Sequence, residues 1–170
     1  TIGVLVRSRS HARELVPMLT KAGVPFSGAE LEFLADAPVV QDLVALTRAL
    51  TNCADRVAWL ALLRAPWCGL TLTDLHQLAY RDHDSAVWEL ICDDGLVDEL
   101  STDGRQRIRS FRSAIAGMLE RRGTLALRDL VEGAWQVLGG PATFFDEADQ
   151  QRADRFLQYL DTLDRGGDCP

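Results

Sequence analysis

Helical periodicity runs through this sequence from Pro38 onward and limits the folds that the chain can adopt. Apolar residues between Val39 and Leu50 recur three and four positions apart, and the same spacing returns in each later segment. Residues at this spacing share one face of an α-helix, which must pack against other helices. The pattern therefore predicts a mainly α chain in which residues 38–170 form a helical bundle.

Short polar motifs mark where these helices begin and end. Asn52 with Asp55, and Thr71 with Asp74, have the three-residue spacing of helix caps. Gly123 and the run Gly139-Gly140-Pro141 are typical helix stops. We therefore predict one helix after Pro38, one before Pro66 and one after Thr71. Further helices are expected over residues 85–91, 102–122, 124–138 and 146–164.

The first 37 residues have a different pattern. Residues 2–6 suit a short buried strand, a helix is expected from Ser8 or Ser10 to about Ala22, and residues 24–26 suit a second strand. A single β-α-β unit cannot make a sheet that is buried on both faces. We therefore interpret residues 1–37 as a β-α-β fragment at the edge of a sheet whose other strands are missing from this chain.

Composition indicates a globular chain without membrane contact. The hydrophobic content of 47% can supply a core. No apolar run approaches the roughly 20 residues of a membrane-spanning helix, and the opening residues do not resemble a secretory signal. We therefore expect a cytoplasmic protein.

The net charge of −7 argues against a nucleic-acid partner, but the charge is unevenly distributed. Residues 1–29 hold Arg7, Arg9, Arg13 and Lys21 against Glu14 alone. From Thr71 onward the sequence has 11 basic and 19 acidic residues. Any contact with nucleic acid is therefore expected near the N-terminal end.

No catalytic or metal centre is recognisable in the sequence. Lys21 is the only lysine and is followed by Ala22, so the phosphate-binding P-loop is absent. The acidic run of residues 146–149 spells a nucleotide-hydrolysis motif, but it follows a helix break instead of a strand, and we interpret it as a first helical turn. The histidines and cysteines lack the spacing of metal ligands, which predicts free thiols at Cys53, Cys68, Cys92 and Cys169.

Two further groups of residues have both a functional and a structural interpretation. One helix face carries three arginines, Arg105, Arg109 and Arg112. This face can be a stripe that contacts phosphates or a solvated surface. The acidic residues around it favour the solvated surface. The four tryptophans can stack on bases or pack in the core, and packing is favoured. They are Trp59, Trp67, Trp88 and Trp135.

Several stretches carry a resemblance to a known family. These are Ile2-Gly3-Val4-Leu5-Val6-Arg7-Ser8-Arg9-Ser10-His11-Ala12, Ala22-Gly23-Val24-Pro25-Phe26, Pro38-Val39-Val40-Gln41-Asp42-Leu43 and Leu62-Leu63-Arg64-Ala65-Pro66-Trp67-Cys68-Gly69-Leu70-Thr71. In order and spacing they resemble a segment of DNA helicases of the UvrD/Rep and RecB type. The likeness covers residues 2 to about 75 and is weaker beyond.

The resemblance implies that residues 1–37 belong to the second motor subdomain and residues 38–170 to the helical 2B accessory subdomain. Arg7, Ser8, Arg9 and His11 would then lie near DNA. The family's Gly-Ile-Gly hairpin offers backbone amides to duplex phosphates, and Gly69 and Thr71 occupy its place. Thr71 replaces the second glycine with a residue whose side chain hinders close approach of the backbone to phosphate, and Thr71 also suits a helix cap.

The expected function is a non-catalytic part of an ATP-dependent DNA helicase that acts in repair or recombination. This part is expected to bind no cofactor, whereas its parent binds ATP and magnesium. Its partners would be single-stranded DNA or a duplex junction, the remaining motor domains, and an exonuclease domain or nuclease subunit. The alternative is a helical protein-interaction module without direct DNA contact. A third class, a small metal-dependent hydrolase, needs ligands that this sequence does not bring together.

Overall fold

The chain divides into two compact units. The computed structural model describes Val4 and residues 15–24, 34–80, 82, 84–144 and 146–163. The first unit is Thr1–Asp36 and the second is Ala37–Pro170. The division falls one residue from the boundary that the sequence predicts between residues 37 and 38.

The described residues of the first unit include the helix α2 (Leu15–Lys21) and the 3-10 turn η1 (Leu34–Asp36). Gly23 follows α2 with a φ of 65°. Glycine adopts this left-handed conformation easily and commonly ends helices. The helix stop predicted at Gly23 is therefore confirmed.

The β-α-β fragment predicted for the first unit is not supported. Val4 and Val24 are the described residues of the two expected strands, and neither is in a strand. The other residues of those strands lie outside the described part of the chain. An isolated strand leaves its backbone N–H and C=O groups without partners, and the described residues supply no second strand to bond them.

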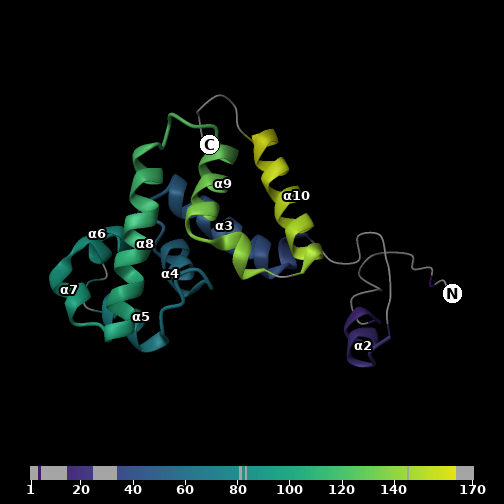
Figure 1. Ribbon diagram of the computed structural model, residues 1–170, viewed down its shortest axis with the longest axis horizontal. Helices are drawn as coiled ribbons and strands as arrows, with labels where there is room; N and C mark the ends of the chain where they lie inside the picture. The colour runs from purple at the N-terminus through teal and green to yellow at the C-terminus, as the bar shows by residue number, and fades with distance from the viewer. Residues whose placement is uncertain are drawn as a thin grey trace. The chain divides into compact units, whose positions relative to one another are not determined.

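The second unit is helical throughout its described part, which confirms the mainly α fold class (Figure 1). One 3-10 turn, η2 (Gly140–Thr143), lies where the sequence predicts a helix break. The helices are α3 (Pro38–Thr51), α4 (Arg56–Arg64), α5 (Leu72–Tyr80), α6 (Val87–Cys92), α7 (Asp94–Asp98), α8 (Thr102–Glu120), α9 (Leu127–Val137) and α10 (Glu147–Leu163).

Side-chain caps explain several of these helix starts. Asp55 caps α4 by accepting a hydrogen bond from the backbone N of Ala58. Asn52, its expected companion, instead accepts one from Ala54 within the preceding turn. Ser101 caps α8 by accepting a hydrogen bond from Gly104. Each cap satisfies a backbone donor that the first helical turn leaves free.

Helix α3 connects the two halves of the second unit. It packs against α4 on one side and against α9 and α10 on the other, and α8 contacts α9 (Figure 1). The apolar faces of these helices supply the core of the second unit. Its largest fully buried side chains are Leu43, Leu46, Leu50, Trp59, Leu62, Leu63, Leu70, Leu78, Ile91, Ile108, Ile115 and Leu157.

Aromatic side chains fill the core between α4, α6 and α8. The Trp59 ring lies 5.5 Å from the Trp88 ring and 6.5 Å, edge to face, from the Phe111 ring. Trp59 and Trp135 are buried. The packing role predicted for these two tryptophans is confirmed, because a buried indole is not available to stack on a base.

A single arginine joins α4 to the end of α5 and the start of α6. The guanidinium of Arg56 donates to the carbonyls of Ala79 at 2.6 Å, Asp82 at 2.7 Å and Ser85 at 2.8 Å. These carbonyls lie at or after the last turn of α5, where a cation complements the helix dipole. Arg56 therefore fixes the geometry of this corner of the bundle.

Candidate nucleic-acid interface

Two of the six residues proposed to contact DNA lie in the described part of the chain. Gly69 and Thr71 form the turn between α4 and α5. Arg7, Ser8, Arg9 and His11 lie outside the described residues. Of the candidate interface, the structure therefore describes the turn at Gly69.

The backbone amides of this turn bond within the protein. The N–H of Gly69 donates to the carbonyl of Ala65 at 2.7 Å, and the N–H of Leu70 donates to the carbonyl of Leu63 at 2.9 Å. An amide that already donates a short hydrogen bond is not free to bind a phosphate oxygen. In this conformation the turn does not present these two amides to a ligand.

Gly69 is needed here for two structural reasons. Its φ of 66° is a left-handed conformation that side-chain-bearing residues rarely adopt. A Cβ atom at this position would also lie 3.0 Å from Nη1 of Arg107. The glycine therefore permits both the chain reversal and the close approach of an arginine.

Two arginines from different helices bind the carbonyls of the same turn. Arg107 in α8 donates to Cys68 at 3.0 Å, and Arg64 at the end of α4 donates to Leu70 at 3.1 Å. Sequence reasoning did not single out either arginine. Arg64 stands within the stretch that carries the family resemblance, whereas no local signal links Arg107 to a turn 39 residues away.

The positive charge of Arg107 is partly compensated. Its Nε lies 2.6 Å from a carboxylate oxygen of Asp103 in an exposed ion pair. The hydrogen bond and the charge of Asp103 raise the pKa of Arg107 further above its usual value. The turn therefore offers less net positive charge to a phosphate than its two arginines suggest.

Thr71 is a helix cap. Its hydroxyl accepts a hydrogen bond from the backbone N of Asp74 at 3.1 Å and donates one to the Asp74 carboxylate at 2.8 Å. The cap predicted at this position is confirmed. Because the hydroxyl's only proton is already donated to Asp74, a further bond to phosphate would have to break this contact.

Asp74 is a buried carboxylate at the centre of a hydrogen-bond network. It accepts bonds from Thr71 and from both the backbone N and the hydroxyl of Ser101. Burial alone raises the pKa of Asp74, but the hydrogen bonds from Ser101 and Thr71 outweigh it, and the pKa lies below its usual value. The network joins the first turn of α5 to the first turn of α8.

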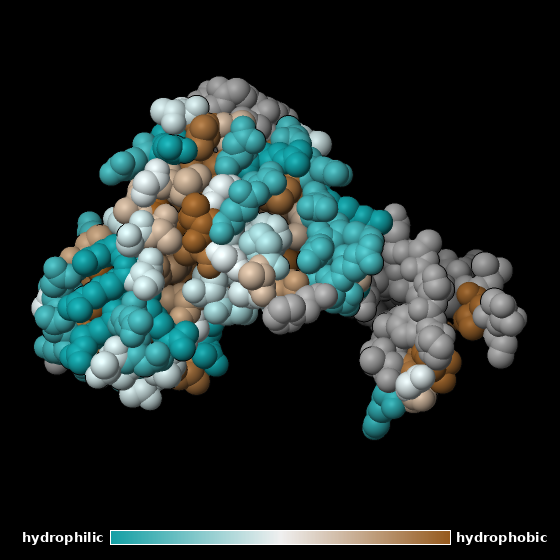
Figure 2. Space-filling model, in the orientation of Figure 1, coloured by the Kyte–Doolittle hydropathy of each residue, from teal (hydrophilic) through white to brown (hydrophobic). Residues whose placement is uncertain are grey.

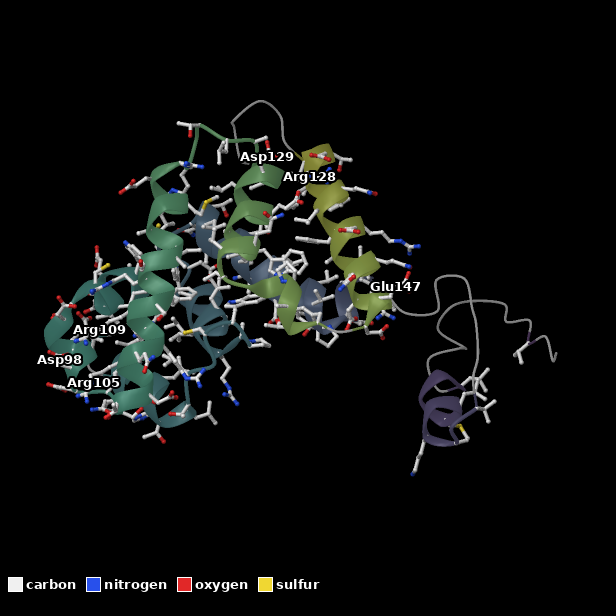
Figure 3. The ribbon with its side chains drawn as sticks, viewed as in Figure 1. Asp98, Arg105, Arg109, Arg128, Asp129 and Glu147 are labelled. Carbon is white, nitrogen blue, oxygen red and sulfur yellow. The ribbon has the colours of Figure 1, made fainter. Side chains whose placement is uncertain are left out.

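The arginines of α8 bind neighbouring helices (Figure 3). Arg105 donates to the carbonyl of Asp98, and Arg109 pairs with the Asp98 carboxylate at 2.6 Å. Arg112 pairs with Asp94 at 2.9 Å and also reaches the last carbonyls of α6. The shared face predicted for these arginines is confirmed. It meets the acidic helix α7 in pairs that remain solvated, since the side chains of Arg109 and Asp98 are 53% and 59% exposed.

The second unit as a whole is acidic. Residues 37–170 include 14 basic and 21 acidic residues. Figure 2 shows hydrophilic residues over α7, α8 and α10, with apolar residues in the seam between α8 and α9. A surface of this charge does not attract the phosphate backbone.

The acidic run at residues 146–149 begins α10. The carboxylate of Asp146 accepts a hydrogen bond from the backbone N of Ala148, and Asp149 pairs with Arg152. Acidic side chains in a first turn are stabilised by the helix dipole. The interpretation of this run as a helix start is therefore confirmed.

Within the described residues, no group of three or more histidine, cysteine or acidic side chains is arranged to hold a metal ion. Cys53, Cys68 and Cys92 are free thiols. Burial raises the pKa of Cys68 to about 12, and Cys53 accepts a hydrogen bond from Arg122 at 2.8 Å. Cys169 lies outside the described residues.

No known family model matches this chain, and no curated protein matches it. None of the helices that the structure describes is both long enough and apolar enough to cross a membrane.

Proposed function

We propose that this chain is a non-catalytic part of an ATP-dependent DNA helicase of the UvrD/Rep and RecB type that acts in DNA repair or recombination. The observation that carries the proposal is the ordered resemblance of residues 2 to about 75, together with the helical build of the second unit, which begins at Ala37. The first unit would be the edge of the second motor subdomain and the helical unit the 2B-like accessory subdomain. ATP and magnesium would bind to the remaining motor domains, in a cytoplasmic parent with or without an attached nuclease.

Direct DNA contact is assigned to the N-terminal segment, through Arg7, Ser8, Arg9 and His11. Arginines there carry charge that is not outweighed by neighbouring acids, and arginine forms strong charge-assisted bonds to phosphate. The turn at Gly69 has a lesser part, because its amides at Gly69 and Leu70 are already used. Any contribution from this turn would come from the guanidinium groups of Arg64 and Arg107.

A second candidate function is a helical protein-interaction module without direct DNA contact. The observation that favours it is the engagement of basic side chains in the acidic second unit. Arg109 pairs with Asp98, Arg112 with Asp94 and Arg128 with Asp161. In this candidate the helical unit would bind a protein subunit of the helicase, and its surface charge would keep it away from DNA.

A salt titration separates the two candidates. Binding of the 170-residue chain to labelled single-stranded DNA would be measured by fluorescence anisotropy between 50 and 200 mM salt, the range over which six to ten phosphate contacts change affinity by about 10³–10⁵. The helicase proposal predicts binding that weakens with salt, and Arg7→Glu with Arg9→Glu should abolish it.

Two controls make the result decisive. The Arg155→Glu variant, which places one such charge change on the exposed face of α10, should leave binding within about twofold of wild type. No binding at 50 mM salt, or an equal loss in the Arg7→Glu/Arg9→Glu double variant and in the Arg155→Glu control, would contradict DNA contact through the N-terminal arginines. Salt-tolerant binding to the separately produced motor domains would then favour the protein-interaction module.

A further inference from the structure

We draw no further inference here: the strongest candidate, the exposed face of α5 formed by Leu72, His76 and Tyr80, carries nothing because nothing in the structure shows what covers it.

Discussion

Ser101 donates two hydrogen bonds to Asp74, one from its backbone N and one from its hydroxyl, both at 2.9 Å. The two residues are 27 positions apart and bring together the first turns of α5 and α8. Gly104 lies against the same carboxylate, and a Cβ there would be 2.8 Å from its carbon atom. The contact requires the carboxylate of Asp74, the hydroxyl of Ser101 and a glycine at position 104. Substitutions can therefore test each of these groups.

Replacement of Gly104 by alanine is expected to destabilise the helical unit by about 1–3 kcal/mol, because the new methyl group overlaps a buried carboxylate. Gly117 is the matched control: it lies in the same helix, and a Cβ there meets nothing within 4 Å. Gly117→Ala should stabilise the unit by up to about 1 kcal/mol through helix propensity. Urea unfolding followed by circular dichroism measures both, and equal effects would refute the contact.

The pKa of Asp74 makes a second prediction about acid stability. Its pKa is lowered in the folded protein, so it contributes stability that is present above the ordinary value of 3.8 and is lost as the pH falls below that value. Asp74→Asn should be less stable than wild type at pH 7. The difference between the two should shrink as the pH falls below about 4. A difference that stays constant from pH 7 to pH 3 would show that the charge of Asp74 has no role.

Asp42 in α3 predicts the opposite pH dependence. Burial raises its pKa to about 6, so the folded state holds a proton that the unfolded state releases. The stability contribution is then lost as the pH rises from 3.8 through 6. Asp42→Asn should stabilise the unit at pH 7 by about 1 kcal/mol, with the full shift discounted for partial exposure. The two proteins should be equally stable at pH 3.5, and a gain that persists there would have another cause.

Local sequence signals predicted the helices because the determinants of helix ends are local. The helix stops at Gly23 and Gly139 need only a glycine that adopts the left-handed backbone conformation. The cap at Thr71 needs only a hydroxyl, three residues before Asp74, that accepts the hydrogen bond of the Asp74 backbone amide. Helix α7 was missed because it is five residues long, too short to show an apolar period.

Contacts between helices were not predictable from the sequence. Arg107 binds the carbonyl of Cys68 across 39 residues, and Arg112 pairs with Asp94 across 18. Periodicity identifies which face of a helix is buried but carries no information on which helix covers it. The engagement of the α8 arginines therefore became visible only with the fold.

The corner held by Arg56 gives a prediction about charge-assisted hydrogen bonds. Arg56→Met keeps most of the apolar stem of the side chain but removes its hydrogen bonds to three carbonyl groups. These carbonyl groups would stay partly shielded from water, so water would not fully replace the lost bonds. We expect a loss of about 2–4 kcal/mol. Arg155→Met on α10 is the control, with an expected change within about 0.5 kcal/mol. If both variants unfold at the same urea concentration, Arg56 does not hold the corner.

The turn at Gly69 allows two effects of one glycine to be separated. Gly69 and Gly123 both have positive φ, 66° and 76°, but a Cβ at Gly123 meets nothing within 4 Å, whereas one at Gly69 lies 3.0 Å from Nη1 of Arg107. Gly123→Ala measures the backbone cost alone, about 1–2 kcal/mol. Gly69→Ala should cost more, because Arg107 must also move from the Cys68 carbonyl.

A double-mutant cycle identifies the extra cost. In an Arg107→Ala background the additional loss from Gly69→Ala should disappear, while the loss from Gly123→Ala should remain, because only Gly69 contacts the arginine. Urea unfolding of the wild type, the three single variants and the two double variants gives the coupling energy of each glycine with Arg107. If Gly69→Ala costs the same with and without the Arg107 side chain, then the glycine serves the chain reversal alone.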